Sequence, residues 1–401
     1  MSALRVLVIT KIFPNAAEPT SAPFNRQQIV ALSRICRVEV LATIPWYPGA
    51  RLLAGRSSAG RLTEVPDREV IEGIDVRHPR TLFVPRIAHG LWAPMYIASI
   101  APLALSYRGK VDVVLGTWAY PDGVAAVALA GLIGVPAVVK LHGSDMNLIA
   151  KLPGPRRLLR LALPRAARVV AVSRALAEEA RALGVPADRV SIVMNGVDAE
   201  LFRPRDRAAA RRELGLPGDA SARIIVYVGN LKETKGVLDL AAAFERIAET
   251  HPETHLAIVG GGDARPALEA VAKRWPGRIT LAGARPLAEV PQWMAACDVL
   301  TLPSWAEGTP NVVLEALASG RRVVASSVGG IPDLITDAQL GELVPARDVA
   351  ALASALGRAA RADYDPAAVA IQAARGGWAE SAARLAAVLA AACGKSAPIV
   401  P

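Results

Sequence analysis

Two carboxylates, Glu307 and Glu315, stand eight positions apart in the second half of this chain of 401 residues. The turn between them and the start of an expected helix are formed by Gly308, Thr309, Pro310 and Asn311. A helix N-terminus presents backbone N–H groups and the positive end of the helix dipole, which suit a phosphate. Ionised carboxylates accept hydrogen bonds from sugar hydroxyls. The segment therefore predicts a site for a nucleotide sugar, in which both kinds of group occur.

A second candidate follows the apolar strand expected at residues 224–229. Gly229 and Asn230 form the turn after this strand, and Lys235 lies near the start of the next helix, where it could meet a diphosphate. Gly260 begins a glycine triplet after another expected strand and admits close approach of a phosphate or a base. Each pattern alone is weak, because a lysine at a helix start is usually solvated and a glycine triplet is a common turn.

Further candidates, on what we expect to be the acceptor side, follow two strands in the first half of the chain. His142 and Asp145 come directly after an apolar strand, where they could bind a sugar hydroxyl, a phosphate or a proton. A single histidine there is more often a structural hydrogen-bonding residue, but the His-Gly-Ser-Asp sequence favours a site. The preceding strand is followed by Trp118, Tyr120 and Asp122. Aromatic rings beside a carboxylate make a sugar platform, and packing between domains would explain them equally well.

The loop after the first strand is long and carries three prolines. Arg26 and Gln27 at its end could reach a phosphate or a hydroxyl group of an acceptor. The residues directly after the strand, Lys11 to Pro14, lack the Gly-x-Gly-x-x-Gly pattern of a Rossmann oxidoreductase. The sequence therefore excludes that class of enzyme.

Short apolar strands alternate with Ala- and Leu-rich helices along the whole chain, and they must position these motifs. The expected strands form two series, at residues 6–10, 38–43, 111–116, 137–141, 168–172 and 191–195, and at residues 224–229, 254–259, 279–282, 299–302 and 323–326. Apolar strands joined by helices predict parallel sheets buried on both faces, so we expect an α/β protein with two doubly wound, Rossmann-like domains. Ligands bind outside the carboxyl ends of such strands, where each motif lies.

A turn at residues 195–198, followed by a stretch with Gly and Pro, marks the boundary between the domains. We expect an N-terminal, acceptor-side domain at residues 1–199 and a C-terminal, nucleotide-sugar-binding domain at residues 200–377. A last helix, at residues 378–395, is apolar along its length, which fits packing against either domain.

The composition fits a globular protein, since 52% of the residues are hydrophobic and 20% are charged. Three widely spaced cysteines predict no disulfide framework, and the N-terminus resembles a strand rather than a signal peptide, so we expect a cytoplasmic protein. Asp363 and Asp365 have the Asp-x-Asp spacing of some metal sites. Asp365 precedes a proline, however, which predicts a helix N-cap, and we expect no metal site.

Positive charge gathers in the first half of the chain. Residues 1–200 hold 24 Lys and Arg against 15 Asp and Glu, whereas the remainder holds 22 against 21. Such a surface should attract a phosphate-linked acceptor or an anionic membrane, although a compositional bias toward arginine would also explain it. The segment at residues 152–163 mixes arginine with leucine as an interfacial helix does, and we expect membrane association through Arg156, Arg157, Arg160, Arg165 and Arg168. Interleaved aromatic residues and a recognition helix are lacking, so we expect no nucleic-acid partner.

Taken together, the motifs resemble the retaining GT-B glycosyltransferases of family 4. The resemblance spans nearly the whole chain and rests on the Glu307/Glu315 pair, on Asn-Gly-Val-Asp at residues 195–198 and on Gly-Gly-Ile-Pro at residues 329–332. It implies a GT-B fold, with two domains facing a cleft, and a metal-independent hexosyltransferase that uses a nucleoside-diphosphate sugar and no cofactor. The branch it resembles serves the cell envelope and exopolysaccharides and includes the teichuronic acid type. This implies a lipid-linked or glycan acceptor and a peripheral place on the inner face of the plasma membrane.

The resemblance also implies roles for single residues. Glu307 would position the donor sugar, Glu315 would contact the ribose, and Lys235 would contact the diphosphate. His142 would lie near the 6-position of the sugar, which makes Glu307, Lys235 and His142 the catalytic candidates. Asn230 stands where the family commonly has an arginine, and this departure removes one cation from the diphosphate site.

Two other functions fit the same residues. A nucleotide-sugar-binding protein without turnover is favoured by Asn230. An epimerase of the same fold would convert the sugar with no acceptor present. Transfer or donor hydrolysis by the purified protein would exclude the binding protein.

Overall fold

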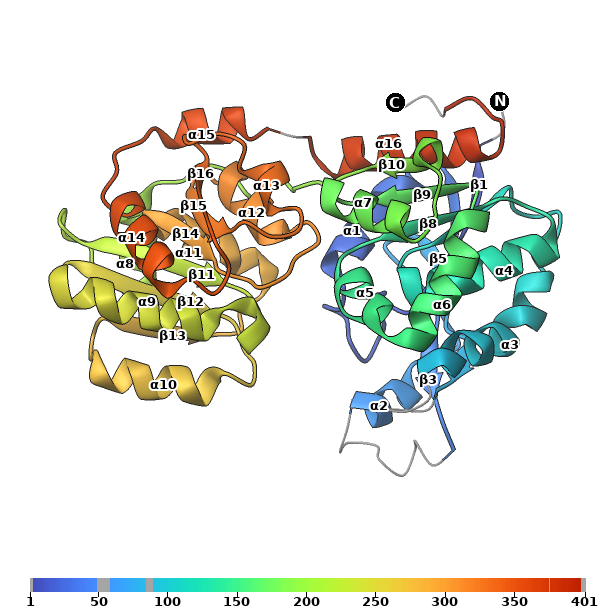
Figure 1. Cartoon of the computed structure of the whole chain (residues 1–401), viewed down its shortest axis with the longest axis horizontal. Coiled ribbons are helices and arrows are strands. Elements are labelled where there is room, and N and C mark those ends of the chain that lie inside the picture. Colours follow the sequence, from blue (N-terminus) through green and yellow to red (C-terminus); the bar gives the residue numbers. More distant parts are fainter. Residues whose placement is uncertain (1–2, 49–57, 84–88, 375, 398–401) are drawn as a thin grey trace. The chain divides into compact units, whose positions relative to one another are not determined.

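The computed structural model describes residues 3–48, 58–83, 89–374 and 376–397, and in this part the chain divides into two compact units (Figure 1). Unit 1 comprises Met1–Asn195 and Trp378–Pro401, and unit 2 comprises Gly196–Gly377. The chain therefore leaves unit 1 after Asn195 and returns to it at Trp378, so that unit 2 is a continuous insertion. Among the described residues, no helix is both long and apolar enough to cross a membrane.

Over the described ranges, unit 1 is built on a sheet of strand order β10-β9-β8-β7-β1-β2-β5-β4. Its strands are β1 (Arg5–Thr10), β2 (Arg37–Ala42), β4 (Arg68–Ile71), β5 (Ile74–Arg77), β7 (Val113–Gly116), β8 (Ala137–Leu141), β9 (Arg168–Ala171) and β10 (Val190–Ile192). Neighbouring strands pair in parallel except for the hairpin β4–β5. A separate parallel pair joins β3 (Ile44–Trp46) to β6 (Arg80–Leu82).

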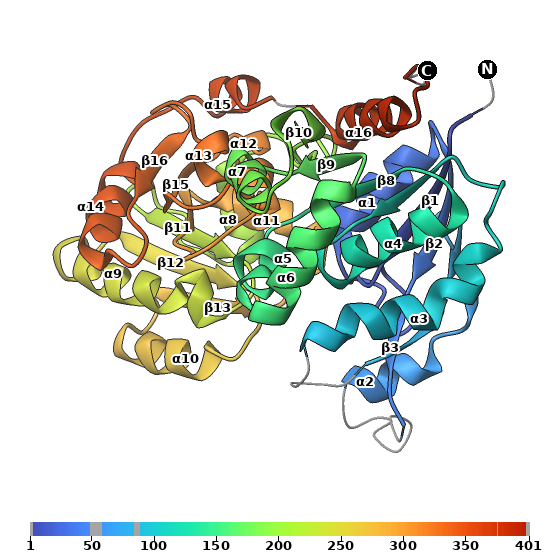
Figure 2. The same ribbon diagram turned by 45° about the vertical axis from the view of Figure 1, so that its right-hand side comes forward.

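Helices cover both faces of this sheet. They are α1 (Pro23–Ser33), α2 (Ser58–Arg61), α3 (Trp92–Leu105), α4 (Val124–Ile133), α5 (Ser144–Asn147), α6 (Pro153–Ala162), α7 (Arg174–Ala182) and α16 (Trp378–Ala392). Helix α1 packs against α16, and α3 packs against α4 (Figure 2). Alternate residues of β1 point to opposite faces: Val6 and Val8 join the core under α1 and α16, whereas Leu7 and Ile9 join the core under α3 and α4. The strand is therefore apolar at every one of these positions.

In the part of the chain that the structure describes, unit 2 has a parallel sheet of strand order β13-β12-β11-β14-β15-β16. Its strands are β11 (Arg223–Val228), β12 (Thr254–Val259), β13 (Ile279–Gly283), β14 (Val299–Leu302), β15 (Arg322–Ser326) and β16 (Gly341–Val344). Its helices are α8 (Arg207–Leu214), α9 (Val237–Thr250), α10 (Arg265–Arg274), α11 (Val290–Ala296), α12 (Asn311–Ala318), α13 (Ile331–Leu334), α14 (Val349–Ala359) and α15 (Pro366–Gln372). The strand order reverses between β11 and β14, which makes this pair the topological switch point where such sheets bind ligands.

Two parallel sheets flanked by helices confirm the expected α/β fold class. Each strand expected from the sequence is present, with bounds shifted by a few residues at most. Five short strands, β3, β4, β5, β6 and β16, were not expected. Among these, β4 and β16 lie at sheet edges, and Val70 of β4 is 72% exposed, so they lack the buried apolar run that reveals a central strand.

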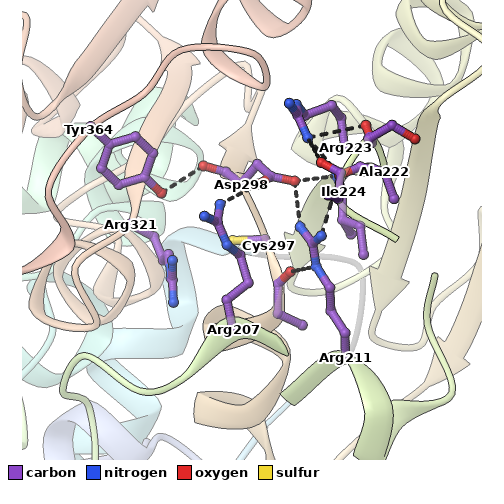
Figure 3. Close-up of polar contacts among 12 residues, drawn as sticks. Arg207, Arg211, Ala222, Arg223, Ile224, Cys297, Asp298, Arg321 and Tyr364 are labelled. Atoms are coloured by element: carbon purple, nitrogen blue, oxygen red, sulfur yellow. Dashed lines mark hydrogen bonds and ion pairs between the residues drawn. The ribbon is translucent and has the colours of Figure 1, made fainter. Parts of the chain in front are cut away.

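A buried ion cluster lies at the amino edge of the sheet of unit 2 (Figure 3). The carboxylate of Asp298 forms ion pairs with Arg207 and with Arg211, whose Nη2 lies 2.6 Å from Oδ2. It also accepts a hydrogen bond from the backbone N–H of Ile224 at 2.6 Å. The hydroxyl of Tyr364 donates to the backbone carbonyl of Asp298 at 2.8 Å. Asp298 therefore ties α8, the first helix of unit 2, to Tyr364 near the end of the same unit.

The Asp-x-Asp motif next to this cluster begins a helix. Asp365 is the N-cap of α15, and its side chain accepts a hydrogen bond from the N–H of Ala367 at 2.9 Å. Pro366 follows as the first helical residue, which confirms the predicted N-cap.

Candidate functional site

Lys235 and Glu307 meet at the switch point of unit 2. Lys235 ends the turn after β11, Glu307 lies in the loop after β14, and these two strands are neighbours. The Nζ atom of Lys235 donates a hydrogen bond to Oε1 of Glu307 at 2.7 Å, across 72 positions of sequence. The lysine side chain is 32% exposed and that of the glutamate is 10% exposed. The two donor-side candidates predicted from separate motifs are thus in direct contact, with the lysine on the more open side.

The loop that carries Glu307 is held by neighbouring backbone. Gly329 has φ +56°, and a Cβ atom there would lie 2.0 Å from the carbonyl oxygen of Glu307, so only glycine fits. The N–H of Gly330 donates to the carbonyl of Gly308 at 2.7 Å, and the N–H of Trp305 donates to the carbonyl of Thr234 at 2.9 Å. The Gly-Gly-Ile-Pro motif therefore fixes the position of the glutamate.

The Gly-Thr-Pro turn leads into α12, the helix expected from the sequence. Pro310 is the N-cap residue, and its side chain has no oxygen that could accept a hydrogen bond from the helix. Thr309 is buried, and Asn311 is partly exposed at the first helical position. The positive end of the helix dipole is therefore not compensated by an acidic side chain of its first turn.

Glu315 lies on α12, and burial raises the pKa of its carboxyl group to about 7. In the described ranges it has no ion-pair or hydrogen-bond partner for its side chain. A carboxylate that is partly buried and unpaired is costly, and hydroxyl donors from a ligand would stabilise its charged form. The position suits the ribose contact that the resemblance implies.

The glycine turns after β11 and β12 pack against each other. Gly260 has φ +152°, and a Cβ atom there would lie 1.8 Å from the carbonyl oxygen of Gly229. The close approach that this glycine allows is therefore between two loops of the protein. Asn230 has an exposed side chain, and its backbone carbonyl accepts a hydrogen bond from the hydroxyl of Tyr227 at 2.9 Å.

A cation beside the Glu307 loop was missed by sequence reasoning. The guanidinium of Arg347 lies 4.0 Å from the centre of the Trp305 ring, and Trp305 is two residues before Glu307. The indole N–H of Trp305 donates to Asp239 at 2.8 Å. Arg347 follows β16, and because that strand was not expected, nothing in the sequence placed this arginine at the carboxyl edge of the sheet.

In unit 1, His142 follows β8 and is 9% exposed. Its ring stacks on Trp118, with centroids 5.9 Å apart, and lies 5.0 Å from the ring of Phe24. Over the described residues, Nε2 of His142 and Nε1 of Trp118 are buried without a hydrogen-bond partner. Burial, together with the nearby charge of Lys140, lowers the pKa of His142 well below its usual value, so the imidazole is neutral at pH 7. Buried polar nitrogens without a partner require an explanation, and a hydrogen bond to a bound ligand would supply one.

Asp145 holds this part of unit 1 together from inside. Its carboxylate is fully buried and accepts hydrogen bonds from the N–H groups of Ala119 at 2.8 Å and Gly143 at 2.7 Å, and also from those of His142 and Met146. It thereby joins the loops after β7 and β8. The oxygens of Asp145, which we expected on the acceptor side, therefore accept hydrogen bonds from backbone amides in this structure.

Tyr120 and Asp122 also face inward. Tyr120 is fully buried, and its hydroxyl donates to the carbonyl of His89 and accepts from the N–H of Ala93 at 3.2 Å. Asp122 is fully buried and accepts a hydrogen bond from the N–H of Lys11 at 2.8 Å, and burial raises its pKa to about 7. Of the three residues expected to form a sugar platform, Tyr120 and Asp122 are buried and Trp118 is partly exposed.

Arg26 and Gln27 lie in the first turns of α1 and are partly exposed, as a binding role requires. The Nε atom of Arg26 lies 3.5 Å from Oε1 of Glu72. The neighbouring Asn25 was not predicted as important, yet it is fully buried. Its Nδ2 donates to the carbonyl of Ile12 at 2.7 Å and to Thr117 Oγ1 at 3.0 Å, which fixes the first loop against the end of β7.

Comparison with known sequences agrees with this geometry. The family described as glycosyl transferases group 1 matches residues 222–362, and the family described as glycosyltransferase family 4 matches residues 32–201. A Bacillus subtilis protein named as a teichuronic acid biosynthesis glycosyltransferase is 30% identical over 363 residues, which is 88% of this chain and 89% of that protein. An N-acetyl-alpha-D-glucosaminyl L-malate synthase from Bacillus anthracis is 27% identical over 65% of this chain and 69% of its own.

Solved structures share the fold. A sucrose-phosphate synthase from Thermosynechococcus elongatus superposes with a TM-score of 0.73 at 20% identity, over 95% of this chain and 97% of that one. HepE from Anabaena, solved in complex with UDP, superposes with a TM-score of 0.66 at 19% identity, over 92% and 98% of the two chains. With the two parallel sheets and the near full-length relative, these matches establish that the chain is a glycosyltransferase of family 4 with the GT-B fold.

Proposed function

We propose that this glycosyltransferase moves a hexose-type sugar from a nucleoside-diphosphate sugar to a hydroxyl group of a lipid-linked or polysaccharide acceptor of the cell envelope, with retention of configuration. The observation that carries the proposal is the contact between Lys235 and Glu307 at the switch point of unit 2. A cation and a carboxylate in contact, beside a helix start whose N-cap residue is a proline, offer partners to both halves of a nucleotide sugar.

The donor side works by charge and position. Negative charge develops on the diphosphate as it departs, and Lys235 with the start of α12 would stabilise that charge. The carboxylate of Glu307 holds the ammonium group at 2.7 Å before any ligand arrives, so less side-chain freedom is lost on binding. Glu307 itself would orient the sugar, and the unpaired carboxylate of Glu315 would accept hydrogen bonds from the ribose. In unit 1, Trp118 and His142 would contact an acceptor hydroxyl through their buried nitrogens.

The acceptor class is supported by the relative that covers most of the chain. The Bacillus subtilis relative, named for teichuronic acid biosynthesis, aligns with 88% of this chain and therefore with most of unit 1 as well as unit 2. The D-inositol 3-phosphate glycosyltransferase of Thermobispora bispora is 38% identical but covers only 51% of this chain. A cell-envelope glycan is therefore the better-supported acceptor, and inositol phosphate is the alternative.

A basic surface on α6 supports a lipid-linked acceptor. Arg156, Arg157 and Arg160, with Pro153 and Leu161, line a surface cavity of about 330 Å³, and Leu161 is 50% exposed. Arginines beside an exposed leucine suit an anionic bilayer surface. Flotation with vesicles that contain phosphatidylglycerol should carry the protein upward, and vesicles of phosphatidylcholine alone should not. Charge removal by Arg156→Gln and Arg157→Gln should weaken flotation more than Arg274→Gln and Arg358→Gln in unit 2; equal effects would contradict this role.

A panel of UDP-, GDP- and ADP-sugars tests the whole proposal. A nucleotide sugar that binds the folded state raises the melting temperature with the logarithm of its excess over Kd. The stabilising donor is then incubated with envelope glycan acceptors, and the anomeric configuration of the product is read by NMR. A panel without any stabilising member would refute the donor assignment. Conversion of the donor sugar without an acceptor would favour the epimerase, and an inverted product would refute retention.

A further inference from the structure

A buried lysine, Lys140, lies two residues before His142 in unit 1. Lys140 is the penultimate residue of β8, and its side chain is fully buried. Its Nζ atom donates a hydrogen bond to Oε1 of Gln28 on α1, and another to Oδ1 of Asn195 at 3.3 Å. Asn195 is the last residue of unit 1 before the chain enters unit 2.

The network continues to the place where the chain returns. Gln28 donates its Nε2 hydrogen to Oγ of Ser381 on α16 at 2.9 Å. Ser381 donates in turn to the backbone carbonyl of Met194 at 2.6 Å. A continuous series of hydrogen bonds therefore links β8, α1, the departing segment and the returning helix α16.

Burial of a lysine without a carboxylate partner costs free energy of folding, which a purely structural position could avoid. Lys140 donates to the side-chain amides of Gln28 and Asn195, and burial lowers its pKa to about 7. Val138, two residues earlier on the same face of β8, belongs to the apolar core under α1 and α16. A well-packed apolar side chain often stabilises such a position as well as a buried charge does. A role beyond stability is therefore a reasonable expectation for Lys140.

The network also touches the elements that carry the acceptor-side candidates. His142 comes directly after β8, two positions beyond Lys140. Arg26 and Gln27 directly precede Gln28 on α1. The ring of Phe24, at the start of α1, packs against the ring of His142, with the two centroids 5.0 Å apart. A shift of α1 against β8 would therefore change the distance between Arg26 and His142.

We propose that Lys140 is a positioning residue of the transfer reaction, which acts through Gln28 and Asn195 to hold α1 and its Arg26 and Gln27 in register with His142. The inference rests on the proposed function, because it assigns the acceptor to unit 1. It predicts that loss of the ammonium group weakens productive binding of the acceptor and leaves the affinity of unit 2 for the nucleotide unchanged.

The central variant is Lys140→Met, which keeps length and volume but removes the donor group. Transfer should fall between about 10- and 100-fold, the loss expected from a misplacement of about 1 Å, and KM for the acceptor should rise. The Kd for the nucleoside diphosphate that stabilises the wild type (UDP, GDP or ADP) should stay within about twofold, because its site has lost nothing.

Two further variants separate positioning from destabilisation. Gln28→Leu removes the first partner and should reproduce the loss, and the double variant with Lys140→Met should be no worse than either alone, because the two residues act as a unit. Asp112→Asn is the matched control. Asp112 lies at the amino edge of the same sheet, where its Oδ1 accepts a hydrogen bond from Nη2 of Arg5 at 2.8 Å. It should lower stability and the active fraction without changing KM for the acceptor.

The outcomes are distinct. An acceptor-specific loss in Lys140→Met or, if that variant does not fold, in Gln28→Leu supports the inference. Wild-type kinetics in the folded variants overturn it, and so does a loss with unchanged acceptor KM like that of Asp112→Asn. A wild-type protein that transfers no sugar from any donor would instead refute the proposed function, and the inference would fall with it.

Discussion

The buried carboxyl group of Glu315 should make donor binding depend on pH. Burial raises its pKa to about 7, and ribose hydroxyls donate more strongly to the ionised form than to the protonated one. With that pKa, about one tenth of the groups are ionised at pH 6 and about nine tenths at pH 8. The association constant for a nucleotide sugar should therefore rise about tenfold between these pH values and level off above them.

The same shift gives a second, opposite effect on stability. The folded-state pKa is raised above the unfolded value of about 4.5, so the protonated carboxyl group favours the folded state and this contribution is lost as pH rises through about 7. Glu315→Gln mimics the protonated form. At pH 8 it should raise the free energy of unfolding by at most about 3 kcal/mol, and the melting temperature should rise with it. It should change the melting temperature little at pH 5.

Calorimetric titration at pH 6, 7 and 8 measures the binding effect. The ligand should be an intact nucleotide sugar rather than a free nucleoside diphosphate, whose terminal phosphate titrates in the same range. The wild type should show the tenfold rise, and Glu315→Gln should bind weakly with no dependence on pH. A flat wild-type profile, or a Glu315→Gln variant that keeps the slope, would refute the role of this carboxylate.

Three further outcomes follow from contacts in the two units. In steady-state assays, transfer should fall at least about 100-fold in both Lys235→Ala and Glu307→Ala. Lys232 is exposed in the same turn as Lys235, and Lys232→Ala should keep a rate near wild type. Comparable losses in all three variants would contradict the assignment. Asp298→Asn leaves buried arginine charge unpaired and should cost about 3 to 5 kcal/mol in denaturant unfolding, so a loss below about 1 kcal/mol would count against the cluster. Leu385→Ala, in the core under α16, should cost about 2 to 5 kcal/mol, and an unchanged midpoint would show that α16 is not part of this core.

The central strands could be predicted because sheets covered on both faces need consecutive apolar residues, as in residues 6–9 of β1 and residues 224–228 of β11. The contact between Lys235 and Glu307 was also within reach, since both follow strands that a doubly wound sheet places side by side. What sequence could not reveal is the direction of a side chain in a loop. Asp145 and Asp122 follow strands as a ligand-binding acid would, yet both turn inward to backbone amides.

Buried polar anchors were equally out of reach. Asn25 and Lys140 donate hydrogen bonds to partners far along the chain, at Thr117 and Asn195 for example, so no local pattern marks them. Their importance becomes visible only when burial and partner are both known.

The late position of α16 in the chain has a consequence for synthesis on the ribosome. Unit 2 is complete once Gly377 has emerged, but unit 1 still lacks the helix that supplies Leu385 and Leu389 to its core. Domains usually fold from the N-terminus as they appear, and here the N-terminal unit must wait for the last helix to be made. Until then the apolar residues of β1 and α1 that pack under α16 stay uncovered, so we expect truncations that reach into α16 to destabilise unit 1.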